Sequence, residues 1–259
     1  MQKRSLLSKI KTNRISKFLR NSFSINPIFI DTSKINHNSI VSDSFAWRTD
    51  QNFSTIFKFS DIVKIFLGID NTEAELIFYD LKNKKIKSID LNKLEISNSI
   101  IIDKKLLDGY EGYGHFYVFF KNQNLMKKEK TILSNRCYLG FKKENVNESY
   151  VHGNTYAYSK SFDYKKDYFN FVNTSIRKNQ KYIIQNQFSD FDYTELFFSN
   201  PTNKKINFDV DKKKYNLGKY ESLIVEIKNI DVIKIISNCY YLRPIVFNYK
   251  DKYFDVYHG

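Results

Sequence analysis

Residues 74–90 read AELIFYDLKNKKIKSID, and residues 194–210 read TELFFSNPTNKKINFDV. Each segment places an Asn-Lys-Lys triplet between stretches in which apolar and polar residues alternate, the pattern of two β-strands joined by a turn. Seven of the seventeen aligned positions are identical, namely Glu75/Glu195, Leu76/Leu196, Phe78/Phe198, Asn83/Asn203, Lys84/Lys204, Lys85/Lys205 and Ile86/Ile206. We therefore interpret the two segments as copies of one structural unit.

Further matches flank these segments in the same order along the chain. They join residues 59–61 to 188–190, Tyr113 and Val118 to Tyr220 and Val225, residues 132–135 to 235–238, and His152-Gly153 to His258-Gly259. Several matches in one order are difficult to obtain by chance. The sequence therefore predicts the tandem duplication of one domain.

The alternation of apolar and polar residues continues outside the matched segments, for example in residues 222–227. Such alternation is typical of antiparallel strands that bury one face. Short runs separated by turns predict an all-β protein of two tandem, internally duplicated antiparallel β-sandwiches of immunoglobulin-like size, with a basic N-terminal arm. The expected parts are the arm and a connector at 1–44, the first sandwich at 45–158, a linker at 159–179 and the second sandwich at 180–259.

The composition is that of a folded protein in a reducing compartment. No stretch of the 259 residues approaches the roughly 18–20 apolar residues of a membrane span, and the N-terminus lacks the apolar core of a secretory signal. Cys137 and Cys239 are too few for a disulfide framework, and we expect them to be buried free thiols. These features predict a cytoplasmic protein, with peripheral attachment to a membrane surface left open.

Lys, Asn, Ile, Phe and Tyr are abundant together, whereas Gly and Pro are scarce. This bias is typical of an AT-rich genome, because these residues have AT-rich codons. The number of lysines or tyrosines therefore indicates no partner by itself.

Positive charge is concentrated at the N-terminus, where residues 1–30 contribute +7 of the total +14. As a helix, residues 1–20 would spread their apolar side chains over more than half of the circumference. This spread predicts a mobile or docked arm rather than an interfacial membrane helix. We expect at most weak contact of residues 1–20 with nucleic acid or another anionic surface.

Histidine is rare, yet His152 and His258 close the two matched copies. A His side chain serves as an acid, a base or a metal ligand near neutral pH. If the copies face each other, His152 and a carboxylate from Asp50 or Asp61 form a candidate catalytic set, with Arg48 as a substrate anchor. The alternative is a structural ending in which the ring bonds a backbone carbonyl and the glycine permits a turn.

Residues found in only one copy are the better place to look for function, because both copies keep what the fold requires. The candidate binding residues around the first copy are Trp47, Arg48, Asp50, His115, Tyr150, His152 and Asn154. An aromatic face and an arginine fork suit a sugar or an anion. The alternative is a tryptophan that plugs the end of the sandwich, beside a surface pair of Arg48 and Asp50.

The chain lacks a nucleophile elbow, a P-loop, a dinucleotide-binding glycine motif and zinc-binding spacing. We therefore expect no cofactor and no metal. The leading hypothesis is a non-enzymatic binding or structural module for a carbohydrate or a protein partner. The alternatives are an enzyme acting on a saccharide or another polar substrate between the copies, and a protein that docks on nucleic acid or an anionic membrane through its basic arm.

Overall fold

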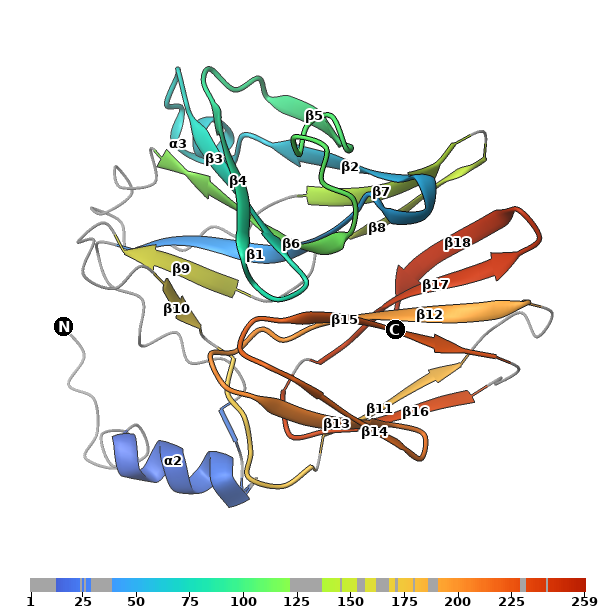
Figure 1. Ribbon diagram of the computed structural model, residues 1–259. Helices are drawn as coiled ribbons and strands as arrows, with labels where there is room; N and C mark the ends of the chain where they lie inside the picture. The colour runs from blue at the N-terminus through green and yellow to red at the C-terminus, as the bar shows by residue number, and fades with distance from the viewer. Residues whose placement is uncertain are drawn as a thin grey trace.

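The computed structural model describes residues 13–23, 25, 27–28, 39–121, 137–144, 146–152, 157–161, 168–170, 172–178, 180–185, 191–228, 232–240 and 242–259. Antiparallel strands dominate these residues (Figure 1). The helices are α2 (Arg14–Phe23) and the short α3 (Ile62–Leu67), with a 3-10 turn, η2 (Asp50–Asn52). The predicted all-β class is confirmed.

The described strands form four antiparallel sheets, which we number in order. Sheet 1 contains, in spatial order, β10 (Tyr168–Asn170), β9 (Ala157–Ser161), β1 (Ser39–Arg48), β6 (Tyr113–Phe120), β3 (Ala74–Asp80) and β4 (Lys85–Leu91). Sheet 2 contains β5 (Ser97–Ile102), β2 (Phe53–Ser60), β7 (Cys137–Lys143) and β8 (Glu148–His152). Sheet 3 contains β11 (Gln180–Gln185), β16 (Val232–Ser237), β13 (Ile206–Val210) and β14 (Lys213–Leu217). Sheet 4 contains β15 (Ser222–Ile227), β12 (Tyr193–Ser199), β17 (Ile245–Lys250) and β18 (Tyr253–His258).

The strand order repeats along the chain. The order β1-β6-β3-β4 in sheet 1 recurs as β11-β16-β13-β14 in sheet 3, and β5-β2-β7-β8 in sheet 2 recurs as β15-β12-β17-β18 in sheet 4. We call β1–β8 the first half and β11–β18 the second half; they occupy the upper and lower parts of Figure 1. Strands β9 and β10, from the region of the expected linker, extend sheet 1 at its β1 edge.

The matched sequence segments do not lie in equivalent strands. Residues 74–90 form the β3–β4 hairpin of sheet 1, whereas residues 194–210 form β12 in sheet 4 and β13 in sheet 3. An Asn-Lys-Lys triplet beside alternating apolar residues recurs readily in a chain rich in these residue types. The pair of His152 and His258 is different, because these residues end the equivalent strands β8 and β18. Common origin of the halves stays a prediction.

Two large apolar cores and one small cluster, formed by Ile77, Tyr117, Phe119 and Tyr220, hold the sheets together. The first core lies between sheets 1 and 2, but it also takes in Phe197, Phe247 and Phe254 from sheet 4. The second core lies between sheets 3 and 4 and includes Leu196 and Phe198. Sheet 4 is therefore shared by both cores.

The expectation of two separate sandwiches is corrected, since the four small sheets have a propeller-like arrangement. The physical reason lies in β12, which is buried on both faces because its Leu196-Phe197-Phe198 run has no polar side. An alternating strand would have left one face of sheet 4 in water. Among the described residues, no helix is long and apolar enough to cross a membrane.

Candidate functional site

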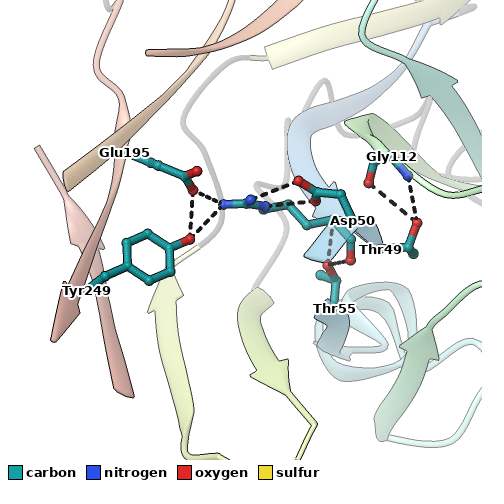
Figure 2. A network of polar contacts seen from close by, with 7 residues as sticks. Thr49, Asp50, Thr55, Gly112, Glu195 and Tyr249 are labelled. Atoms are coloured by element: carbon teal, nitrogen blue, oxygen red, sulfur yellow. Dashed lines mark hydrogen bonds and ion pairs between the residues drawn. The ribbon is translucent and has the colours of Figure 1, made fainter. Parts of the chain in front are cut away.

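Arg48 lies at the end of β1, fully buried where the first half meets the second. Its guanidinium contacts Asp50, Glu195 and Tyr249, which are labelled in Figure 2. Nε and Nη2 donate to the two carboxylate oxygens of Asp50 at 3.0 and 2.9 Å. Nη1 donates to Glu195 Oε2 at 2.5 Å and to the Tyr249 hydroxyl oxygen at 3.1 Å. The Tyr249 hydroxyl in turn donates to the same Glu195 oxygen at 2.7 Å.

Two aromatic rings, which contact each other edge-on, pack against this guanidinium. Arg48 Cζ lies 4.5 Å from the centroid of Phe53 and 4.8 Å from that of Phe247. Burial works to lower the pKa of Arg48, but the hydrogen bonds to Asp50 and the nearby Tyr249 and Glu195 raise it above the usual range. Burial raises the pKa of Tyr249, so its hydroxyl stays protonated. Arg48 therefore stays positively charged, and the Tyr249 hydroxyl stays neutral.

The donors of Arg48 are directed at the chain's own acceptors. Its backbone is also fixed, because the Thr55 hydroxyl accepts from Arg48 N at 2.8 Å and donates to Arg48 O at 3.1 Å. Arg48 comes from the first half, whereas Glu195 and Tyr249 come from the second. The network therefore joins the halves rather than leaving an arginine fork open to a ligand.

Trp47 is also fully buried and lies in the first core. Its indole N–H donates to the Tyr79 carbonyl at 2.9 Å, and Tyr110 packs edge-on against the ring at 5.9 Å. Gly114 lies opposite Trp47 in the ladder, and a Cβ there would collide with the Tyr79 carbonyl oxygen. Trp47 thus plugs one end of the first half.

His115 is buried on the opposite face of sheet 1 from the first core. Its ring stacks on Tyr79 at 5.3 Å and 8°, with Tyr117 edge-on at 5.3 Å. Neither ring nitrogen has a hydrogen-bond partner among the described residues. Burial lowers the pKa of His115 to about 3, so the ring is neutral at physiological pH.

The three candidate catalytic residues are not brought together. Asp61 is buried and caps α3, accepting from Val63 N and Lys64 N at 3.1 and 3.0 Å and from the Thr72 hydroxyl. A capping carboxylate satisfies the free N–H groups of a first helical turn.

His152 and Asp50 lie near opposite ends of sheet 2. Tyr138 at the start of β7 pairs with His152, and Lys143 at its end pairs with Phe53, which follows η2. Five residues of antiparallel strand span roughly 17 Å. The two groups therefore share no site.

The two terminal histidines do converge, at the edge where β8 runs beside β18. His258 Nε2 lies 2.8 Å from the His152 carbonyl oxygen. Next along the edge, Val256 N donates to Ser149 Oγ at 2.9 Å, and Asn147 Nδ2 donates to Phe254 O at 2.7 Å. These bonds cover two strand edges that would otherwise be open to pairing. Because the contact joins the His258 ring to the backbone carbonyl of His152, it is a structural contact.

The outer face of sheet 2, which points away from the first core, carries two exposed tyrosines and an exposed isoleucine. Tyr138 is 51% exposed, Tyr150 38% and Ile101 59%. The His152 ring lies 4.9 Å from that of Tyr138, and Lys58 Nζ lies 4.6 Å from the centroid of Tyr150. We call Lys58, Ile101, Tyr138, Tyr150 and His152 the aromatic face.

Tyr150 is held flat by its neighbours. A Cβ at Gly140, its partner across the ladder, would lie 2.5 Å from the Tyr150 ring. The Tyr150 hydroxyl donates to Glu148 Oε2 at 2.9 Å, and this bond, together with Lys142, lowers the pKa of Glu148. The face is therefore an ordered surface with charged groups at its margin.

Sequence reasoning named Tyr150 and His152 but missed Tyr138, Ile101 and Lys58. The period of two in β7 and β8 was the available signal, because residues 138, 140, 150 and 152 share one side of adjacent strands. Asn154 lies outside the described residues. Cys137 and Cys239 are free and buried, as expected, and burial raises the pKa of both thiols.

No family model matches the sequence, and no curated protein matches it. Among solved structures, the chain is similar to an anti-sigma factor domain-containing protein, with 10% identity and a TM-score of 0.20 over 83% of this chain and 80% of the other. It is also similar to a cupin 2 conserved barrel domain protein from Leptotrichia buccalis, with 10% identity and a TM-score of 0.17 over 83% and 93% of the two chains. TM-scores this low establish neither a shared fold nor a shared function.

Proposed function

We propose that this protein is a non-enzymatic binding module that holds a saccharide on the aromatic face of sheet 2. The observation that carries the proposal is the pair of exposed tyrosines on one ordered sheet surface, with Tyr138 beside His152 and Tyr150 beneath Lys58. Large apolar side chains that gather on a surface mark an interaction site more often than scattered ones do.

The chemistry of the face suits a hydroxyl-rich ligand. An aromatic ring packs against the C–H groups of a sugar, and nearby polar groups bond its hydroxyls. Lys58 supplies donors, Glu148 supplies acceptors, and His152 supplies either. A purely apolar protein partner would need fewer such groups at the centre of its contact.

In the second half, the equivalent sheet face has a structural role. The corresponding face of sheet 4 is covered, because Phe197, Phe247 and Phe254 pack into the first core. The same side of sheet 2 carries Tyr138 and Tyr150 into solvent. The proposal therefore assigns ligand binding to the first half and structural packing to the second.

Replacing Tyr138 with alanine is expected to weaken glycan binding by about tenfold or more, the usual effect of losing an aromatic hot spot. A glycan array would identify the ligand, and titration calorimetry would compare the proteins. Gly140→Ala should weaken binding as well, because the new methyl displaces the Tyr150 ring.

Tyr253→Ala is the matched control, since Tyr253 is 53% exposed on β18, outside the aromatic face. Equal losses of glycan affinity in Tyr138→Ala and Tyr253→Ala would show that the glycan does not bind on the aromatic face. A wild-type protein that retains no glycan would overturn the proposal.

A second candidate function, attachment to an anionic membrane surface, is favoured by the orientation of α2. Ile15, Phe18, Leu19 and Phe23 are 68%, 63%, 48% and 65% exposed, and together they span about 140° of the helix. Asn21 and Ser22 of α2 are buried, so the helix contacts the protein near its C-terminal end. The helix α2 spans Arg14–Phe23, a different segment from residues 1–20, for which the expected poor amphipathicity stays a prediction. An outward apolar stripe on α2, in a segment whose sequence carries seven basic residues between positions 1 and 30, complements an anionic interface.

Phe18→Ser combined with Phe23→Ser is expected to lower binding to phosphatidylglycerol vesicles by about tenfold or more, because each phenyl group loses its apolar burial. Vesicle sedimentation measures this loss, and high salt should weaken binding by the wild type. Ile176→Ser with Ile183→Ser changes two similarly exposed side chains outside α2 as a control. Equal binding to pure phosphatidylcholine would contradict the role of charge.

A further inference from the structure

A pocket of about 630 Å³ opens at one end of the second half. Its floor is apolar and consists of Val210, Val225 and Ile227, which belong to the second core and are at most 9% exposed. Tyr215 lines one wall and stacks on Phe208 at 5.5 Å. This volume is in the range of small-molecule sites.

The same end of the first half is closed. There the connection after β5, residues 103–112, places Leu107 in the first core at 1% exposure, with Tyr110 packed against Trp47. An ion pair of 2.6 Å between Lys87 and Asp108 ties this loop to β4. The equivalent connection after β15 spans only residues 228–231. The second half thus has an opening where the first half has a plug.

The charges at the mouth of the pocket favour an anion. Glu226 is paired with Lys228 at 3.2 Å, whereas Asp211 accepts from the backbone N–H of Lys234 at 2.9 Å and keeps its charge, so three lysines line the pocket against two acidic residues. Lys212 and Lys213 are exposed and form no ion pair with another described residue. Two ammonium groups therefore stand beside an apolar floor.

We propose that this pocket binds an apolar small molecule with an acidic head group. The apolar part displaces water from Val210, Val225 and Ile227, and the carboxylate faces the ammonium groups of Lys212 and Lys213. Apolar burial supplies most of the affinity, while the charge pair fixes the orientation of the ligand. The site lies on the second half, apart from the aromatic face, and its test is independent of glycan binding.

Decanoate is a suitable probe, with decyltrimethylammonium as a cationic molecule of the same chain length. Titration calorimetry should show that decanoate binds at least about tenfold more tightly than the cationic probe. Lys212→Gln with Lys213→Gln should reduce decanoate affinity by about fivefold or more and bring the two probes closer together. These positions are exposed, so the variant is expected to fold.

Lys204→Gln with Lys205→Gln is the matched control, because it removes the same charge from an exposed turn outside the pocket. It should leave decanoate affinity within about twofold of the wild type. Equal loss in both double variants would show a general charge effect and overturn the proposal. Absence of decanoate binding to the wild type, or equal binding of the two probes, would overturn it as well.

Discussion

Replacing Arg48 with methionine is expected to lower the free energy of unfolding by about 3–5 kcal/mol, the usual effect of breaking a buried ion pair from one side. Methionine fills much of the space between Phe53 and Phe247. It provides no donor for Glu195, which is 5% exposed and would keep a buried charge without its partner. Loss of the contact between the halves adds to this effect. Urea unfolding followed by circular dichroism measures the change.

Two further variants separate charge from geometry. Arg48→Lys should recover little of the lost stability. The planar guanidinium bonds Asp50 and Glu195 simultaneously, whereas a single ammonium group cannot. Adding Glu195→Gln to Arg48→Met should recover part of the loss, since the buried charge disappears.

Lys87→Met is the control and should cost less than about 1 kcal/mol, because the Lys87–Asp108 pair lies at the surface. If the free energy of unfolding of Arg48→Met lies within about 1 kcal/mol of the wild-type value, the network does not hold the two halves together.

Replacing His115 with phenylalanine is expected to change how stability depends on pH. Burial lowers the pKa of His115 to about 3 in the folded protein, against about 6.5 in the unfolded chain. Between these values only the unfolded chain takes up the proton. The stability linked to His115 is therefore complete above pH 6.5 and is lost as the pH falls towards 3.

Relative to the wild type, His115→Phe should gain stability by about 1 kcal/mol for each pH unit below 6.5. At pH 7 it should be equally stable or more stable by about 1–3 kcal/mol, because the two unpartnered nitrogens are removed while the stack on Tyr79 is kept. Urea unfolding at several pH values gives both quantities. A difference between the two proteins that does not vary with pH would contradict the prediction.

The pH dependence of wild-type stability does not isolate the contribution of His115, because Asp43 contributes as well. Burial raises the pKa of Asp43 to about 7, so its contribution to stability is complete below about pH 4 and is lost as the pH rises to 7. The two residues therefore oppose each other between about pH 4 and 6.5. Asp43→Asn should make stability increase with pH in this window, and His115→Phe should make it decrease.

The sequence predicted the strands well because their signal is local. Alternation with a period of two follows from the pleat of a strand, so β13 and β15 could be recognised without a partner. The expected burial of Cys137 and Cys239 also holds, because small apolar side chains within strand-forming runs face a core. The alternative that Trp47 plugs a sandwich end agrees with its placement in the first core.

The matched sequence segments do not identify the equivalent strands of the two halves. Matches between residues 74–90 and 194–210 depend on residue types that are frequent throughout this chain, and these segments occupy different sheets. The repeated strand order follows from which strands pair, and pairing depends on contacts between residues far apart in the chain.

The all-β class and the positions of many strands were thus determined by the sequence itself, through local alternation and turn chemistry. The tertiary structure alone decided which faces stay open. Glu195 reads as a surface carboxylate until the fold places it against Arg48, 147 residues away. Tyr138 reads as a core residue until sheet 2 turns it outward, and Val225 reads as an ordinary core residue until the fold places it at the floor of a pocket. Burial of a side chain depends on what packs against it, and a single strand carries no record of its distant neighbours.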